Sequence, residues 1–249
     1  MKNKKTNKYF SIFGINNSIN MLSSDKIQII SIFLLKDSLA FKDIDIKKGI
    51  KSFPDKVIIL EKHEFNNKFP SIRSQGILIN FEFELNNSLP QFSNKNTCLL
   101  LPERIEDPQN LGQIIRTSEC AGIDGLLISD NRTVGITNSV FQVSQGAFLN
   151  MPIYMIGNIS QTLEMLKKEG FWVIGVENSV EASNWYDIDL DGKIILVFGS
   201  EGKGIRQSTL KKCDFIATIP MLGKINSLNI SASVSAILFE RNRQLSSSK

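Results

Sequence analysis

The sequence predicts an α/β protein whose larger part is a parallel β-sheet covered by helices on both faces. Two observations predict this fold. Short apolar runs alternate with helical patterns, and polar, glycine-containing loops follow three of those runs. This alternation is typical of parallel sheets buried on both faces, and ligands of such sheets bind beyond the carboxyl ends of the strands. The expected strands are 98–101, 126–129, 172–176, 194–198 and 215–219.

The N-terminal part of the chain predicts a second, smaller α/β domain. Its apolar, β-branched runs predict strands at 27–35, 57–60 and 77–83, with helices at 16–22 and 41–52. The polar stretch 86–96 (NNSLPQFSNKN) is typical of a linker. We therefore expect a domain over 1–88, a linker at 89–96 and a second domain over 97–249.

The positive charge lies in the N-terminal part. The net charge is +4, and residues 1–90 hold 14 Lys or Arg against 9 Asp or Glu. An anionic partner such as RNA would be met there first. A basic tail that keeps the protein soluble explains the charge equally well.

The cysteines and the hydropathy indicate a cytoplasmic protein. The three cysteines stand apart without a CxxC pair, so we expect neither disulfides nor a zinc site, and no metal. The most apolar stretch, 27–35, is far shorter than the ~20 residues that a bilayer requires. The basic start is not followed by an uninterrupted apolar region, so we expect no signal peptide and no membrane partner.

The first informative loop, PERIEDPQNLGQIIRTSECAGIDG, leads into a helix. Asp107 is a good N-cap, Pro108 suits the first helical position, and Gly122 ends the helix. Arg116 falls well away from the apolar face of this helix. The plainer interpretation of Arg116 is an ordinary solvated arginine, which is the commoner case. The plainer interpretation of Asn110 is a polar residue in the first turn of the helix.

The second loop, LVFGSEGKGI, places Gly199, Gly202 and Gly204 at the carboxyl end of a strand. Glycine there lets a ligand approach the backbone closely. The spacing matches neither a dinucleotide fingerprint nor a phosphate loop, so a tight turn is the alternative. A tight turn does not account for Glu201, because a lone carboxylate inside a glycine turn does not stabilise the turn.

The third loop, IPMLGKINSLNISASVSAILFE, passes from a strand end through a polar segment into a helix. One face of that helix carries very small side chains, which permit close backbone packing. The members of this face are Ser231, Ala232, Ser235 and Ala236. Helix capping is the plainer interpretation of Ser227 and Asn229.

In this order and spacing, the three loops resemble the motifs of the SpoU family of RNA methyltransferases, also called the TrmH family. The resemblance covers 97–243, and the intervening SxGA element is also present. The residues that carry it are Asn110, Arg116, Ser144, Gly146, Ala147, Phe198, Gly199, Glu201, Gly202, Gly204, Ile219, Pro220, Met221, Gly223, Ser227, Leu228, Asn229 and Ser231.

The resemblance implies an S-adenosylmethionine-dependent enzyme that methylates a ribose 2′-hydroxyl of RNA. It implies a parallel sheet with a trefoil knot. The residues alone would not predict a knot, because connections between helices and strands almost never thread through loops. It also implies a homodimer whose site is shared across the interface. The implied catalytic residues are Asn110, Arg116, Glu201, Ser227 and Asn229. The implied cofactor-binding residues are Phe198, Gly199, Gly202, Ile219, Met221 and Leu228.

The N-terminal part resembles the family's accessory RNA-binding domain, a ribosomal-protein-like α/β fold. The carriers are 13–22 (FGINNSINML) and 74–82 (SQGILINFE), with Ser74 where the family usually has a histidine. This domain makes the chain most similar to members that methylate a guanosine ribose in 23S ribosomal RNA. Two alternatives stay open: a transfer-RNA ribose methyltransferase, or a non-catalytic RNA-binding factor for ribosome assembly.

The residues constrain how the nucleophile is activated. Histidine is the usual base, but the only one, His63, lies in the accessory domain. The resemblance points to Arg116, and an arginine is effectively never deprotonated. Our hypothesis is that Arg116 stabilises charge developing on the 2′-oxygen and fixes the adjacent phosphate, while Ser227 and Asn229 orient the ribose.

Trp172 lies within an expected strand, so we expect its side chain in the core.

Overall fold

The computed structural model describes residues 9–70, 72–129, 133–179, 182–200 and 202–247. Its internal contacts divide the chain into two compact units. The first comprises Met1–Glu84 and Thr137–Leu149, and the second comprises Leu85–Ile136 and Asn150–Lys249. The domain boundary at 89–96 stays a prediction. That Thr137–Leu149 packs with the first unit was not predicted from the sequence.

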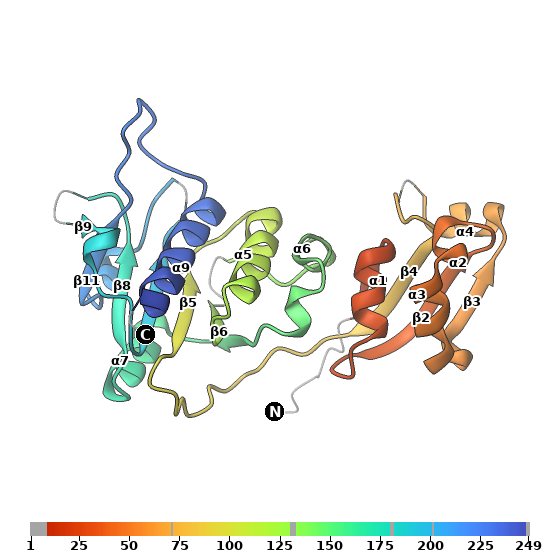
Figure 1. Ribbon diagram of the computed structural model, residues 1–249, viewed down its shortest axis with the longest axis horizontal. Helices are drawn as coiled ribbons and strands as arrows, with labels where there is room; N and C mark the ends of the chain where they lie inside the picture. The colour runs from red at the N-terminus through yellow and green to blue at the C-terminus, as the bar shows by residue number, and fades with distance from the viewer. Residues whose placement is uncertain (1–8, 71, 130–132, 180–181, 201, 248–249) are drawn as a thin grey trace. The chain divides into compact units, whose positions relative to one another are not determined.

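The first unit contains a four-stranded sheet in the order β1-β4-β2-β3 (Figure 1). β4 pairs antiparallel with β1 and β2, whereas β2 and β3 pair in parallel. The strands are β1 (Tyr9–Phe13), β2 (Gln28–Leu35), β3 (Val57–Leu60) and β4 (Ile77–Glu82). Strands were predicted at the last three positions, but β1 was not.

Among the described residues, four α-helices of the first unit come from the N-terminal segment: α1 (Ile15–Leu22), α2 (Leu39–Lys42), α3 (Ile44–Gly49) and α4 (Lys62–Lys68). The single helix predicted over 41–52 is wrong. The carboxylate of Asp43 accepts hydrogen bonds from the backbone N–H groups of Asp45 and Ile46, and it therefore starts α3 as a separate helix.

Helix α6 (Asn138–Ser144) covers the open edge of β1. The backbone N–H groups of Ser11 and Phe13 donate to the side-chain oxygens of Asn138 and Gln142, at 2.9 and 3.1 Å. The Gln142 amide donates back to the Phe13 carbonyl at 2.9 Å. An edge strand offers unpaired backbone groups, and α6 satisfies them. Beside it a cluster of aromatic rings forms from Phe10, Phe81, Phe83, Phe141 and Phe148.

The second unit contains a seven-stranded sheet in the order β7-β6-β5-β10-β8-β11-β9, with every pair parallel. Its strands are β5 (Cys98–Pro102), β6 (Gly125–Ser129), β7 (Ile153–Ile156), β8 (Trp172–Val176), β9 (Ser183–Asn184), β10 (Ile194–Phe198) and β11 (Phe215–Thr218). The predicted parallel sheet is confirmed, and β7 and β9 are additions to it. β5, β6 and β10 are buried along their whole length, as strands covered on both faces must be.

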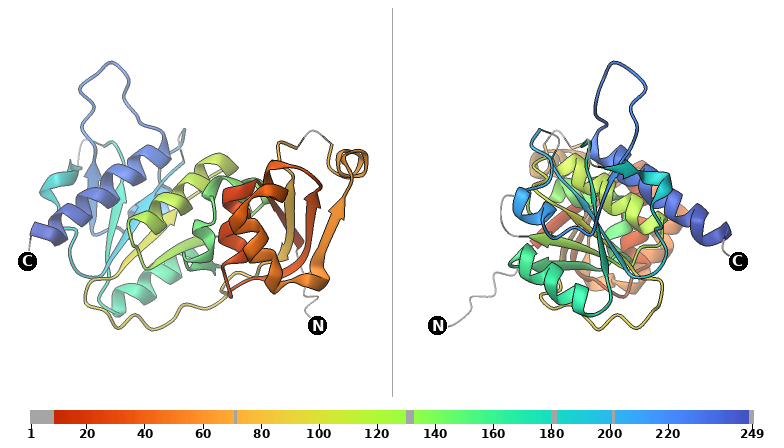
Figure 2. Two further views of the ribbon diagram at one scale, coloured as in Figure 1. Left: turned by 45° about the vertical axis from the view of Figure 1, so that its right-hand side comes forward. Right: turned by 90° about the vertical axis from the view of Figure 1, so that its left-hand side faces the viewer.

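Helices cover both faces of this sheet (Figure 2). They are α5 (Pro108–Cys120), α7 (Ile159–Lys168), α8 (Gln207–Leu210) and α9 (Ile230–Ser247). α5 begins as predicted, because the carboxylate of Asp107 accepts from Gln109 N at 2.8 Å and Pro108 is the first helical residue. α5 and α9 pack side by side, with the hydroxyls of Thr117 and Ser235 3.4 Å apart. In the described part of the chain, no helix is long and apolar enough to cross a membrane.

The prediction that Trp172 belongs to the core is wrong. Its side chain is 55% exposed, and its ring lies 5.7 Å from that of Phe215, which is also exposed. Trp172 is the first residue of β8, and burial begins with the next residue. Strand membership therefore did not imply burial at the strand end.

The three cysteines differ in their environments, and we expect them to differ in reactivity. Burial raises the pKa of Cys98, in β5, and of Cys213, each to about 12, whereas Cys120 is exposed on α5. The thiolate is the reactive form. We expect iodoacetamide at pH 8 to modify Cys120 in the native protein, and Cys98 and Cys213 only after unfolding. Mass spectrometry of peptides checks this; native labelling of Cys98 would contradict the buried position of β5.

Candidate active site

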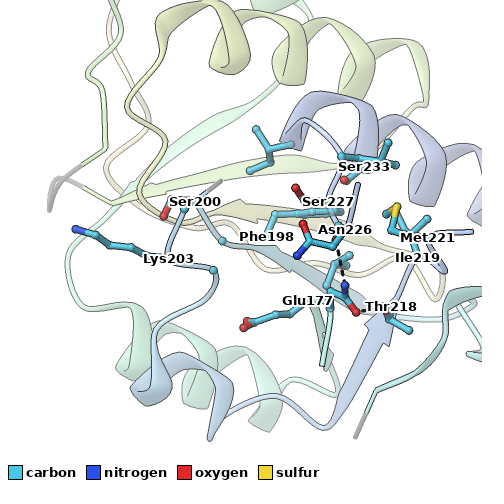
Figure 3. A pocket seen from close by; sticks show the side chains of 17 residues that line it. Glu177, Phe198, Ser200, Lys203, Thr218, Ile219, Met221, Asn226, Ser227 and Ser233 are labelled. Atoms are coloured by element: carbon cyan, nitrogen blue, oxygen red, sulfur yellow. Dashed lines mark hydrogen bonds between the residues drawn. The ribbon is translucent and has the colours of Figure 1, made fainter. Parts of the chain in front are cut away.

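A cavity of about 490 Å³ lies at the carboxyl ends of β8, β10 and β11, where the second and third predicted loops meet (Figure 3). All six residues predicted to bind the cofactor line it: Phe198, Gly199, Gly202, Ile219, Met221 and Leu228. Ser227, predicted to be catalytic, lines it as well. The structure therefore brings the second and third motifs together around one cavity.

The glycine loop after β10 folds tightly on itself. The backbone N–H of Gly204 donates to the Ser200 carbonyl at 2.9 Å. A Cβ atom on Gly199 would lie 2.0 Å from the carbonyl carbon of Gly204, so no side chain fits there. Gly204 has φ +61°, a conformation that glycine adopts freely. The loop is thus both a tight turn and a wall of the cavity. Glu201 lies outside the described residues.

Two carboxylates that the sequence analysis did not single out hold the far end of this loop. Glu177 accepts a hydrogen bond from Ile205 N at 3.1 Å and also lines the cavity. Glu103, only 1% exposed, accepts from Arg206 N at 3.0 Å, and its Oε1 forms an ion pair with the Arg206 Nε at 2.9 Å. A buried charge needs such partners. These carboxylates fix the backbone just beyond Gly204.

The third loop is tied to the end of β8. The Asn178 amide donates to the Asn226 carbonyl at 3.1 Å, and the Thr218 hydroxyl lies 3.5 Å from the Asn178 Oδ1. Figure 3 shows Asn226 and Ser227 on the same side of the cavity as this contact. Asn178 also went unpredicted. The rule that ligands bind beyond the carboxyl ends of parallel strands could have found it, since it follows Val176 by two positions.

Asn110 and Asn229 join the first and third motifs. The Asn229 amide donates to the Asn110 Oδ1 at 3.0 Å. The Asn229 Oδ1 accepts from the backbone N–H of Ser231 at 2.9 Å and from its hydroxyl at 2.6 Å, at the start of α9. Asn229 therefore bonds the first turn of α9, in agreement with the plainer interpretation, and also orients Asn110, which is 9% exposed.

Arg116 is not brought to this cavity within one chain. Its side chain is exposed on α5, and it is not among the residues that line the cavity. Among the described residues, no hydrogen bond or ion pair engages its guanidinium. Within a single chain Arg116 is therefore an ordinary solvated arginine, in agreement with the plainer interpretation of its sequence position.

Comparison with known proteins identifies the family. The model of the SpoU rRNA Methylase family matches residues 97–239, which is more than half of the chain. The chain is also similar to the 23S rRNA (guanosine-2′-O-)-methyltransferase RlmB of Coxiella burnetii. The two are 33% identical over 242 residues, which cover 94% of this chain and 95% of that protein.

Solved structures share the fold. The SpoU methyltransferase AviRb from Streptomyces viridochromogenes, in complex with the cofactor AdoMet, matches with a TM-score of 0.81 at 17% identity, covering 96% of this chain and 91% of that one. An AdoMet-bound rRNA methyltransferase from Sinorhizobium meliloti matches with a TM-score of 0.77 at 19% identity, covering 95% and 88%. Sequence and structure agree with the motif-based expectation, and the chain belongs to the SpoU rRNA methylase family.

Proposed function

We propose that this protein transfers a methyl group from S-adenosylmethionine to the ribose 2′-hydroxyl of a guanosine in 23S ribosomal RNA. One observation carries the proposal: residues from both the second and the third family motif line a single cavity at the carboxyl ends of three parallel strands. The choice of a guanosine in 23S rRNA is supported by the similarity to RlmB along 94% of the chain.

The cavity fits the proposed cofactor. Its volume of about 490 Å³ lies within the usual range for small-molecule sites, roughly 300–1,000 Å³. Phe198, Met221 and Leu228 offer apolar surface for an adenine ring, while Glu177 and Thr218 offer polar atoms. S-adenosylmethionine supplies a methyl group on a sulfonium, whose leaving group is a neutral thioether. The chain therefore needs no acid for departure. It must instead orient the sugar hydroxyl, whose proton passes to solvent as the O–CH₃ bond forms and the S–CH₃ bond breaks.

The roles of the polar residues follow from their positions. Ser227 lines the cavity and can present its hydroxyl to a ribose, and Asn229, held by Ser231 and Asn110, would orient the residues around it. The guanidinium of Arg116 would stabilise negative charge developing on the 2′-oxygen, since such preorganised donors act on the transition state. Because Arg116 does not line the cavity of its own chain, we assign it to the site of a second subunit in a homodimer.

Three further features belong to this proposal. The first is the trefoil knot, supported by the close approach of α9 to α5 through the small residue Ser235. The second is an RNA-binding role for the N-terminal, ribosomal-protein-like domain, supported by its 14 Lys or Arg against 9 Asp or Glu within residues 1–90. The third is a cytoplasmic location, supported by the similarity to RlmB of Coxiella burnetii, a 23S rRNA methyltransferase.

A binding and activity experiment tests the function. We expect saturating S-adenosylmethionine, at about 100 times its Kd, to raise the thermal midpoint by about 5–10 °C. We expect radioactive methyl groups to enter 23S rRNA from cells lacking this protein, and nuclease digestion to yield 2′-O-methylguanosine. Incorporation into transfer RNA instead would support the tRNA alternative. Absence of cofactor binding would support the non-catalytic assembly factor.

A further inference from the structure

A second cavity, of about 240 Å³, adjoins the first and shares a wall with it. Ser200, Gly202, Lys203 and Ile230 line both cavities. The remaining lining residues are Arg104, Ile105, Glu106 and Asp107, from the segment between β5 and α5, and Asn110, from the first turn of α5. Since the first cavity is where we place the methyl donor, the second is where an acceptor nucleoside would approach it.

Arg104 occupies this cavity in an unusual backbone conformation. Its φ of +60° lies in the left-handed region, which a long side chain adopts at an energetic cost and glycine adopts freely. The Nε atom is buried without a hydrogen-bond partner, although the side chain as a whole is only half-buried. No ion pair among the described residues engages it. Strain and an unused buried donor at one residue are typical of functional sites.

Among the described residues that line the cavity, one carboxylate makes no contact and is free to bind a ligand. Asp107 is engaged at the start of α5, through its bond from Gln109 N. Glu106 is exposed and makes no hydrogen bond or ion pair within the described chain. Lys203, on the shared wall, is exposed as well. A ligand of this cavity thus meets an unpaired guanidinium and an unpaired carboxylate.

Guanine matches these two groups, and adenine does not. Guanine offers the acceptors O6 and N7 on one edge, which arginine binds with two donors. Its N1–H and N2–H₂ groups are donors that a carboxylate can accept together. Adenine carries a donor at the position of O6 and lacks the N1–H and the amino group at C2. A carboxylate and a guanidinium in one cavity therefore favour guanine.

We propose that this second cavity binds the guanine base of the acceptor nucleoside, with Arg104 on O6 and N7 and Glu106 on N1–H and N2–H₂. This inference rests on the proposed function and deepens it, because it assigns the base specificity to two residues outside the family motifs quoted above. Lys203 would contact the phosphate, a contact that carries no base preference.

The first experiment uses free nucleotides and needs no catalysis. Binding of GMP, IMP and AMP to the full-length protein is measured by ligand-observed NMR. We expect GMP to bind about tenfold more tightly than AMP or IMP. Glu106→Gln should abolish the preference of GMP over IMP, because IMP lacks only the amino group at C2. Lys203→Ala is the matched control, and it should weaken all three nucleotides by the same factor.

The second experiment tests Arg104 and separates its binding role from a structural one. Arg104→Gly should keep the thermal midpoint within about 3 °C of the wild type, because glycine tolerates the left-handed conformation. It should abolish the roughly tenfold advantage of GMP over 7-deaza-GMP, which lacks the N7 acceptor. Equal wild-type binding of GMP and AMP, or preferences that survive both substitutions, would overturn the proposal. Guanine preference without any methyl transfer would overturn only the proposed function.

Discussion

Replacing Arg116 with alanine should lower kcat about 10²–10³-fold and leave the affinity for S-adenosylmethionine unchanged. The size is that found when one preorganised donor to a developing oxyanion is removed. The affinity should not change, because the proposal places the guanidinium of Arg116 against the 2′-oxygen of the ribose and not against the cofactor. Arg116→Lys should lose only about tenfold if charge is what matters, since lysine keeps the charge without the planar fork. Single-turnover kinetics and calorimetry measure the two quantities. A lysine variant as inactive as the alanine variant would indicate a need for guanidinium geometry or proton acceptance.

Mixed dimers test whether Arg116 serves the neighbouring subunit. Arg116→Ala subunits are combined with Ser227→Trp subunits, whose cavity is filled by the new ring. A symmetric dimer that exchanges Arg116 between subunits gives each mixed dimer one complete site, so an equal mixture should recover roughly a quarter of wild-type activity. Each variant alone should stay inactive. No recovery in a mixture shown to contain mixed dimers would place Arg116 in the site of its own chain.

Replacing Gly199 with alanine should weaken S-adenosylmethionine binding more than 100-fold and destabilise the protein by about 1–3 kcal/mol, the usual cost of overpacking. The added methyl would lie 2.0 Å from the Gly204 carbonyl carbon and 2.2 Å from Ile205 N. Backbone atoms cannot rotate away as a side chain can, so the loop must open and the cavity wall must move. Calorimetric titration and urea unfolding measure the two effects.

Gly202→Ala is the matched control for this substitution. Gly202 lies in the same loop and lines the same cavity, but a Cβ there would meet nothing within 4 Å, and its φ is not positive. We expect its stability to stay within about 0.5 kcal/mol of the wild type. Equal destabilisation by both variants would show that the close contact at Gly199 is not what holds the loop.

The fold of the second unit was predictable because its central strands are continuous apolar runs. β5 and β10 can be recognised from their own residues, without knowledge of the strands they pair with, since both are buried along their length. β1 and β7 were missed for a different reason: each is a short strand that only its neighbours stabilise. The grouping of α6 with β1 depends on Gln142 and Phe141 meeting residues about 130 positions earlier, which no local pattern contains.

The candidate site was predictable where residue types follow a family pattern, as at Gly199 and Ser227. It was not predictable where a common residue type acts through position alone. Glu103 looks like any surface glutamate in the sequence, yet it is 1% exposed and holds Arg206. The unusual φ of Arg104 is a property of the folded backbone and has no sequence signature, since arginine seldom adopts it.

The hydrogen bonds from β1 to Asn138 and Gln142 have a consequence for folding during synthesis. During synthesis, the part of the first unit up to Glu84 leaves the ribosome more than fifty residues before Thr137–Leu149, the segment that shields its edge strand. Until that segment arrives, the backbone N–H groups of Ser11 and Phe13 lack these partners. An exposed strand edge is a template for association with other chains. A fragment ending near residue 88 would keep that edge open permanently, so the N-terminal sheet should be isolated together with Thr137–Leu149.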